Sequence, residues 1–325
     1  MALIPVRKPY YITQFIDNLA VSVKSWPFNE TEPVDYQYTI NKVSFTDGVA
    51  EDLAVDISPF IKPVFVMEPL TQQADGSTTI KDTEYLNVRV LVNAVDELHT
   101  ATNGWEDPSS NNPLFDTPVH TKNIHNNTRD NLTINNVGVT EVDYIKHDGS
   151  IYTLALTVEN LYHVIPVKPT ALSLLDTNTL RIDVKYATGT ISYNYKIVCP
   201  FDRLLIGFVN SIGTWEYITF VGRNTYSLNT DGETYVPGDT HSLQKFGVNG
   251  YETVMANTGI MNDGFTRVLN ELFLSEHVVL NNGGGYVFRK VVLETPNYTN
   301  ISGRARKIVN YELRFRNSDK NIPTI

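Results

Sequence analysis

The sequence predicts a mainly β fold of two β-sandwich-like domains, with one amphipathic helix in the C-terminal half. Three observations point to this fold class. Short runs of alternating apolar and polar residues recur along the chain and are separated by turn residues, as in sandwiches and barrels. The composition includes 18 Tyr and 14 Phe beside many β-branched residues, which favour strands. The 325 residues, 42% of them hydrophobic, can bury a sizeable core without cross-links.

The N-terminal half begins with two predicted strands and a long polar tract. Alternation is visible in Val34–Ile40 and is stronger in Glu84–Val92, whose even-numbered apolar residues share one face. Residues 100–136 are rich in Asn, Pro, Ser, Thr and Asp and have little periodicity. We expect an extended loop there that reaches a neighbouring subunit, the alternative being a mobile surface loop without a partner.

Trp105 lies in this polar tract and is a candidate interface residue. An exposed indole there could stack on a sugar ring or bury itself in a neighbouring subunit, and the second use is favoured.

Two further strands, Val139–His147 and Ile151–Glu159, flank Asp148-Gly149-Ser150 and predict a hairpin. Beyond them, Pro166 and Pro169 interrupt the pattern without helical periodicity. We place the domain boundary at these prolines, which gives an N-terminal domain over residues 1–165 and a C-terminal domain over residues 170–325.

The C-terminal half repeats the alternating style. Strands are expected at Leu180–Tyr186, Ser192–Val198, Arg203–Val209, Trp215–Val221, Val278–Leu280, Tyr286–Leu293 and Val309–Arg316. The four residues Asn210-Ser211-Ile212-Gly213 predict a hairpin turn, with Gly213 permitting the turn and Trp215 filling a core.

One helix is predicted over about residues 262–276. Its apolar residues recur at helical spacing and form a single stripe: Phe265, Val268, Leu269, Leu272 and Phe273. Asn262 or Asp263 can cap the first turn.

The net charge of −10 is unevenly distributed. Residues 1–170 carry 22 acidic and 11 basic groups, whereas residues 171–325 carry 14 and 15. The negative balance argues against a simple nucleic-acid coat, because phosphate contacts need excess Lys and Arg. The asymmetry suits a head-to-tail contact between copies of the chain, and the alternative is an acidic surface that aids solubility.

The basic residues near the C-terminus are the candidate interface residues with an electrostatic partner. They are Arg304, Arg306, Arg314 and Arg316, of which the last two share one strand face. They could meet carboxylates of the acidic half across an interface. A DNA phosphate contact is possible although unlikely, and a solvated strand face is the remaining alternative.

We expect no catalytic, cofactor-binding or metal-binding residues. His120 and His125 miss the i, i+4 spacing of paired helical metal ligands, and Cys199 fits a small buried residue beside a strand. Gly283-Gly284-Gly285 lacks the Lys-Ser or Lys-Thr of a phosphate-binding loop. The carboxylates that could supply a glycosidase pair are best interpreted as solvated loop residues: Asp96, Glu97, Glu106 and Asp107.

The start of the chain has neither a signal peptide nor a cleavage site, and no apolar run reaches membrane-spanning length. The single cysteine excludes an internal disulfide framework, which suits folding in a reducing cytosol. These features predict a chain that folds without export or a membrane.

Five stretches, taken together, resemble the virion structural proteins of tailed phages that infect Bacteroidetes, including crAss-like phages. They are Pro5–Ile12, Asp56–Ile61, Phe208–Glu216, Asn257–Gly259 leading into the predicted helix, and Tyr311–Phe315. Lys8 stands where that pattern usually has Ser, and Ser211 stands where it has Arg.

The resemblance implies a non-catalytic tail, neck or ring component, assembled in the host cytoplasm as a closed homo-oligomeric ring beside other virion proteins. The alternative from the residues alone is a carbohydrate-binding or adhesin module on a phage or cell surface, because β-sandwiches with exposed aromatic loops often bind glycans. A polysaccharide hydrolase is disfavoured by the missing catalytic pattern.

Overall fold

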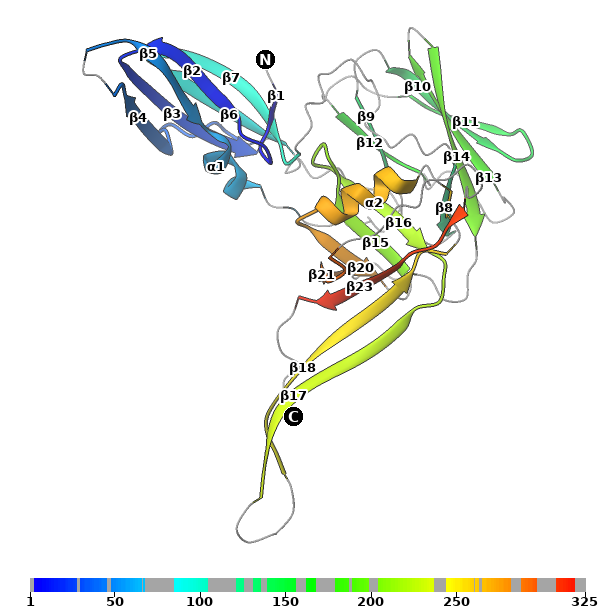
Figure 1. Cartoon of the computed structure of the whole chain (residues 1–325). Coiled ribbons are helices and arrows are strands. Elements are labelled where there is room, and N and C mark those ends of the chain that lie inside the picture. The colour runs from blue at the N-terminus through cyan, green and yellow to red at the C-terminus, as the bar shows by residue number, and fades with distance from the viewer. Residues whose placement is uncertain are drawn as a thin grey trace.

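The computed structural model confirms a mainly β protein (Figure 1). It describes residues 3–27, 30–45, 48–65, 67, 85–104, 121–125, 131–135, 139–155, 162–167, 179–186, 189–198, 204–236, 244–259, 261–262, 265–281, 288–296 and 308–318. Strand pairing together with the hydrophobic cores groups the six sheets into three units, which we call the N-terminal, middle and C-terminal units.

The N-terminal unit is a sandwich of two layers. A five-stranded sheet has the order β1-β7-β6-β3-β4, and β2 pairs with β5 in the second layer. The strands are β1 Leu3–Pro5, β2 Tyr11–Ile16, β3 Asn18–Pro27, β4 Tyr38–Val43, β5 Glu51–Asp56, β6 Tyr85–Val92 and β7 Val95–Thr102. Alternate residues of β3, β5 and β6 are buried and meet in one core, and the short α1 (Ser58–Ile61) and 3-10 helix η1 (Lys62–Val64) follow β5.

The middle unit pairs a five-stranded sheet, β11-β10-β13-β14-β8, with the two-stranded β12-β9. Its strands are β8 Thr121–His125, β9 Asn131–Asn135, β10 Val139–Lys146, β11 Ile151–Ala155, β12 Tyr162–Pro166, β13 Thr179–Tyr186 and β14 Gly189–Val198. Leu132 and Ile165 of the small sheet share a core with Val142 and Ile182 of the large one. This shared core makes the two sheets a single sandwich.

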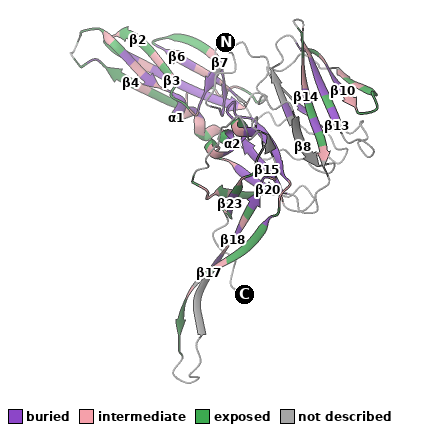
Figure 2. Ribbon diagram, turned by 45° about the vertical axis from the view of Figure 1, so that its right-hand side comes forward, coloured by how far each residue is buried: buried purple, intermediate pink, exposed green. Residues whose placement is uncertain are grey.

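The C-terminal unit is a seven-stranded sheet of order β16-β15-β20-β21-β23-β18-β17, covered on one face by α2 (Phe265–Leu274). Its strands are β15 Leu204–Val209, β16 Trp215–Phe220, β17 Thr225–Tyr235, β18 Gln244–Asn257, β20 Val278–Asn281, β21 Arg289–Leu293 and β23 Glu312–Asn317; β19 Met261–Asn262 pairs with β22 Ile308–Val309. Every residue of β15 and β16 is buried, and Figure 2 shows this part of the sheet as the buried centre of the molecule.

The strand pairing corrects the expected division into two domains at residues 165–170. β10, before these residues, pairs over seven positions with β13, after them. Pro166 is the last residue of β12, where its partner is Asn131. Proline is tolerated at the end of a strand. Pro166 therefore ends a strand without ending the sandwich.

The expected loop at residues 100–136 is also partly corrected. β7 continues to Thr102, and residues 121–125 and 131–135 are strands. β8 pairs in parallel with β14, and β9 pairs with β12. Both are held by distant partners, which a search for local periodicity cannot detect. Residues 105–120, 126–130 and 136 lie outside the described residues.

Most of the other local predictions agree with the structure. The strand expected at Val34–Ile40 begins only at Tyr38, and the strand expected at Val309–Arg316 is interrupted at residues 310 and 311. The helix predicted at 262–276 is α2, shortened because Met261 and Asn262 form β19. Phe265, Val268, Leu269 and Leu272 are buried. Both hairpin turns form: Gly149 and Gly213 have φ values of 81° and 94°, the left-handed region that favours glycine.

Candidate interaction surfaces

The β17–β18 hairpin projects from the C-terminal unit as an arm (Figure 1). β18 has 14 residues, which corresponds to about 46 Å at the usual rise of a strand. Several large apolar side chains on the arm are exposed: Tyr226 (50%), Leu228 (59%), Tyr235 (48%) and Val236 (57%). Tyr226 and Leu228 are two residues apart on β17, so they share one face of the arm. Neighbouring exposed apolar side chains of this size are typical of interaction sites.

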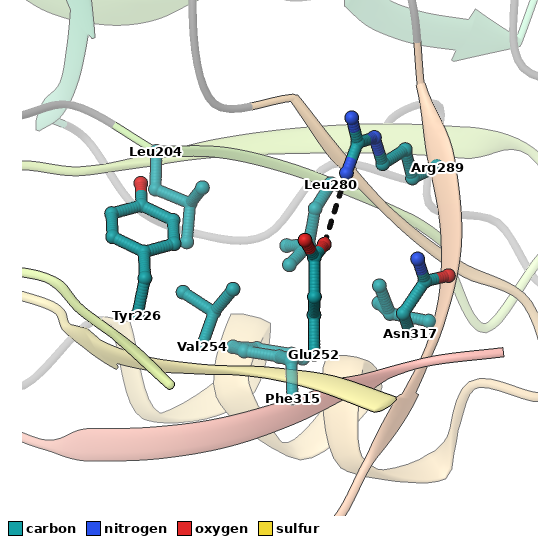
Figure 3. Close-up of a pocket in the computed structure, with 9 residues that line it drawn as sticks. Leu204, Tyr226, Glu252, Val254, Leu280, Arg289, Phe315 and Asn317 are labelled. Carbon is teal, nitrogen blue, oxygen red and sulfur yellow. Dashed lines mark hydrogen bonds and ion pairs between the residues drawn. The ribbon is translucent and has the colours of Figure 1, made fainter. Parts of the chain in front are cut away.

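A shallow groove lies where the arm joins the sheet (Figure 3). Its apolar lining is Leu204, Tyr226, Val254, Leu280, Val291 and Phe315. Five of these residues also belong to or pack against the core under α2, so the groove continues that core beyond the helix. Arg289 Nη1 lies 3.2 Å from Glu252 Oε2 over the groove. The volume is about 40 Å³, far below that of pockets that enclose small ligands, so the groove suits a protruding side chain.

The opposite face of the same sheet carries the predicted basic residues. Arg314 is registered with Met255, and Arg316 lies between Thr253 and Val292. Leu313 and Phe315 point to the α2 side, so the arginines point away from it. Glu294 bridges both: its carboxylate lies 3.0 Å from Arg314 Nε and 3.3 Å from Arg316 Nε. The guanidinium of Arg316 also lies 5.5 Å from the ring centroid of Tyr251.

This bridge modifies the prediction for the basic cluster. The side chains of both arginines remain nearly half exposed, at 45% and 44%. One carboxylate neutralises only one of the two cations, so a positive charge remains on the face. Trp105, Arg304 and Arg306, the other predicted interface residues, lie outside the described residues.

The N-terminal and C-terminal units are in close backbone contact at a junction formed around Gly104 and Gly213. A Cβ at Gly104 would stand 2.4 Å from the Ser211 carbonyl oxygen, and a Cβ at Gly213 would stand 2.6 Å from the Asn103 carbonyl carbon. Gly104 also accepts a 2.9 Å hydrogen bond from the Arg7 backbone N–H. The two backbones thus pass closer than side chains would permit.

Hydrogen bonds and ion pairs, the first buried and the second exposed, lie around the junction. Glu271 of α2 accepts hydrogen bonds of 3.3 Å from the Ser211 N–H and hydroxyl. Lys62 Nζ lies 2.8 Å from Glu276 Oε1, and its hydrogen bond lowers the pKa of that carboxyl. Burial lowers the pKa of Arg7, although the nearby Glu276 charge opposes the shift.

An apolar cluster adds to this junction. Met67 and Phe65, from the chain after η1, pack with Trp215 and Tyr217 on the sheet face away from α2. Trp215 is therefore in a core, as predicted. Two further hydrogen bonds join segments that are far apart in the sequence. Tyr10 donates its N–H to Asp56 over 3.0 Å, and Thr258 donates its N–H to the Tyr311 carbonyl over 2.9 Å.

The carboxylates weighed for glycosidase chemistry lie apart from any pocket described here. Asp96 pairs with Arg89 at 2.9 Å, and Glu97 lies 3.3 Å from His99 Nε2. Burial lowers the pKa of His99 and outweighs the charge of Glu97. Glu106, Asp107, His120, Cys199 and the 283–285 glycines lie outside the described residues, and the side chain of His125 is not described.

Two searches of the described residues gave negative findings. No group of three or more His, Cys, Asp and Glu side chains is arranged to hold a metal ion. None of the helices in this part of the chain has the length and apolar character needed to cross a membrane.

The sequence reasoning missed the arm and the bridging residue Glu294. The signal for the arm was present: Pro237-Gly238 is a turn sequence between two stretches rich in Thr, Tyr and Val. No local sequence pattern indicates the bridging role of Glu294, because that role depends on β21 lying beside β23.

No family model matches the chain, and no curated protein matches it. Among solved structures, one similar chain is the N-terminal four Ig domains of Dscam1 isoform 4.44, at 11% identity and a TM-score of 0.19. The match covers 78% of this chain and 63% of that one. Similarity at this level carries no argument about fold or function.

Proposed function

We propose that this chain is a non-catalytic structural subunit that assembles with copies of itself into a closed ring. The observation that carries the proposal is the β17–β18 arm, which projects from its own unit with large apolar side chains exposed. Exposing such side chains costs solvation free energy that contact with another subunit would recover. The pairing of β18 with β23 of the sheet would hold the base of the arm in a fixed direction.

The particular assembly that we propose is a tail, neck or ring component of a phage virion, built in the host cytoplasm. The resemblance of five sequence stretches supports this part of the proposal. The partners would then be further copies of the chain and other virion proteins. No membrane or DNA partner is invoked.

Assembly can be tested on Tyr226 and Leu228, which lie on the groove side of the arm. The purified protein is expected to form particles larger than a monomer in native mass spectrometry and negative-stain images. Tyr226→Ser/Leu228→Ser should reduce assembly strongly, because it removes exposed apolar area from the contact. Val34→Ser/Ile151→Ser, at two exposed apolar positions outside the arm, is the matched control and should assemble like the parent.

The opposite outcome would be a parent protein that stays monomeric at every concentration tested. Glycan-array binding by that monomer would favour the carbohydrate-binding or adhesin alternative, and self-assembly would then be wrong.

A further inference from the structure

The tip of the N-terminal unit exposes unusually large apolar side chains. Four of them surround the end of the sandwich: Phe15 (71%), Val43 (59%), Phe45 (98%) and Val49 (53%). They come from the ends of β2 and β4 and from the loop before β5. The strand ends are adjacent, because Ile16 pairs with Glu51 and Asn18 with Val43. Figure 1 places this tip at the end of the unit remote from the C-terminal unit.

Acidic groups are interleaved with these apolar side chains. Asp17 and Asp52 are exposed, and Asp52 is registered directly opposite Phe15. Glu51 accepts a hydrogen bond from the Phe45 N–H. Among the described residues of this tip, the cation is Lys42, which donates to the Ala54 carbonyl. Three carboxylates against one ammonium leave this tip, which we call the acidic tip, with a charge of about −2.

The face that bears Arg314 and Arg316 has the complementary character. Its cations are Lys290, Arg314 and Arg316, against the carboxylates of Glu294 and Glu312. Exposed apolar side chains stand among them: Met255 (43%) beside Arg314 and Val292 (46%) beside Arg316. This surface, which we call the basic face, thus combines exposed apolar side chains with a net charge of about +1.

We propose that the acidic tip of one copy docks on the basic face of a second copy, head to tail. This inference rests on the self-assembly in the proposed function and adds a contact separate from the one made by Tyr226 and Leu228, on the opposite face of the sheet. Charge selects the basic face over the groove, because the groove pairs Arg289 with Glu252 and offers no surplus charge. Two unlike patches in contact make a heterologous interface, which generates a closed ring when the rotation between copies closes.

The test reverses the charges on each side separately and then together. Asp17→Lys/Asp52→Lys should raise the protein concentration for half-assembly about tenfold or more, and Arg314→Glu/Arg316→Glu should do the same. The quadruple variant should recover to within about threefold of the parent, because the attraction is restored with opposite signs. Phe45→Ser should weaken assembly without altering the melting temperature, since the side chain is 98% exposed.

Lys196→Glu, at an exposed position on β14 of the middle unit, is the matched control and should leave assembly unchanged. If placing two glutamates beside Glu294 prevents folding, the tip variants and Phe45→Ser test the contact alone. Tip variants that assemble like the parent, while Tyr226→Ser/Leu228→Ser disrupts assembly, would overturn this contact and leave the proposed function standing. A parent protein that never assembles would instead remove the proposed function.

Discussion

Gly104 and Gly213 bring the N-terminal and C-terminal units together because neither has a side chain. Backbone atoms of Asn103 and Ser211 occupy the space that a Cβ would need. Backbone atoms cannot rotate away as a flexible side chain can. The junction is therefore sensitive to the smallest addition of volume.

Replacing Gly104 with Ala should destabilise the protein by about 1–3 kcal/mol, the usual cost of overpacking. Urea unfolding followed by fluorescence would measure the loss. Gly250→Ala is the matched control, because the nearest atom to its added Cβ would be 3.5 Å away and ordinary contact is tolerated. Equal stability of the Gly104 variant and the parent would mean that the two backbones separate at little cost.

The burial of His99 is expected to make the free energy of unfolding fall at acidic pH. Burial lowers its pKa below the ordinary 6.5, so the folded protein resists a proton that the unfolded chain accepts. Stability should therefore be complete above about pH 7 and decline as the pH falls through 6.5 towards 5. Burial lowers the pKa of His277 as well, so it contributes in the same window.

His99→Gln/His277→Gln should flatten the stability profile between pH 7 and 5, measured as the urea midpoint at each pH. The parent and the double variant are compared at matched ionic strength. An unchanged slope in the double variant would show that neither histidine is responsible.

At the scale of secondary-structure elements, α2 covers the larger of the two hydrophobic clusters in the C-terminal unit. Its buried stripe packs on Leu204, Phe208 and Phe315 of the sheet. A helix of ten residues is marginal alone, so this packing provides most of its stability.

Leu272→Ala should cost about 2–5 kcal/mol, because it leaves a cavity beneath α2. Leu274→Ala, at a position that is 63% exposed on the same helix, should cost less than about 0.5 kcal/mol. Differential scanning calorimetry of both variants gives the comparison. If both melt with the parent, the helix does not belong to the cooperative core.

At the scale of the whole molecule, a surface of net negative charge and a surface of net positive charge lie on two different units of the same chain. The acidic tip belongs to the N-terminal unit and the basic face to the C-terminal unit. Exposed ion pairs are each worth about 1 kcal/mol or less, so apolar contact must supply most of the affinity. Charge would then act mainly on register and on the rate of association.

Raising the salt concentration from about 50 to 500 mM should slow assembly several-fold. Particles that are already formed should dissociate little over the same range. Stopped-flow light scattering for assembly and dilution for dissociation separate the two rates. An assembly rate independent of salt would argue against charge steering.

The sequence by itself determined the features that depend on near neighbours. The alternation in β6, β13, β16 and β23, the stripe of α2 and the turns at Gly149 and Gly213 were all visible, because side-chain direction repeats with the local backbone geometry. The face shared by Arg314 and Arg316 followed from the same two-residue period. The mainly β class was therefore predictable from residues alone.

Which distant segments lie together is visible in the tertiary structure and was not predictable from local sequence patterns. It placed β13 beside β10, and so replaced two expected domains with three units. It also brought Glu294 between the two arginines and Gly104 against Ser211, and it directed the arm out from the sheet. These outcomes depend on long-range strand pairing, which costs chain entropy and is decided by the whole core rather than by any local pattern.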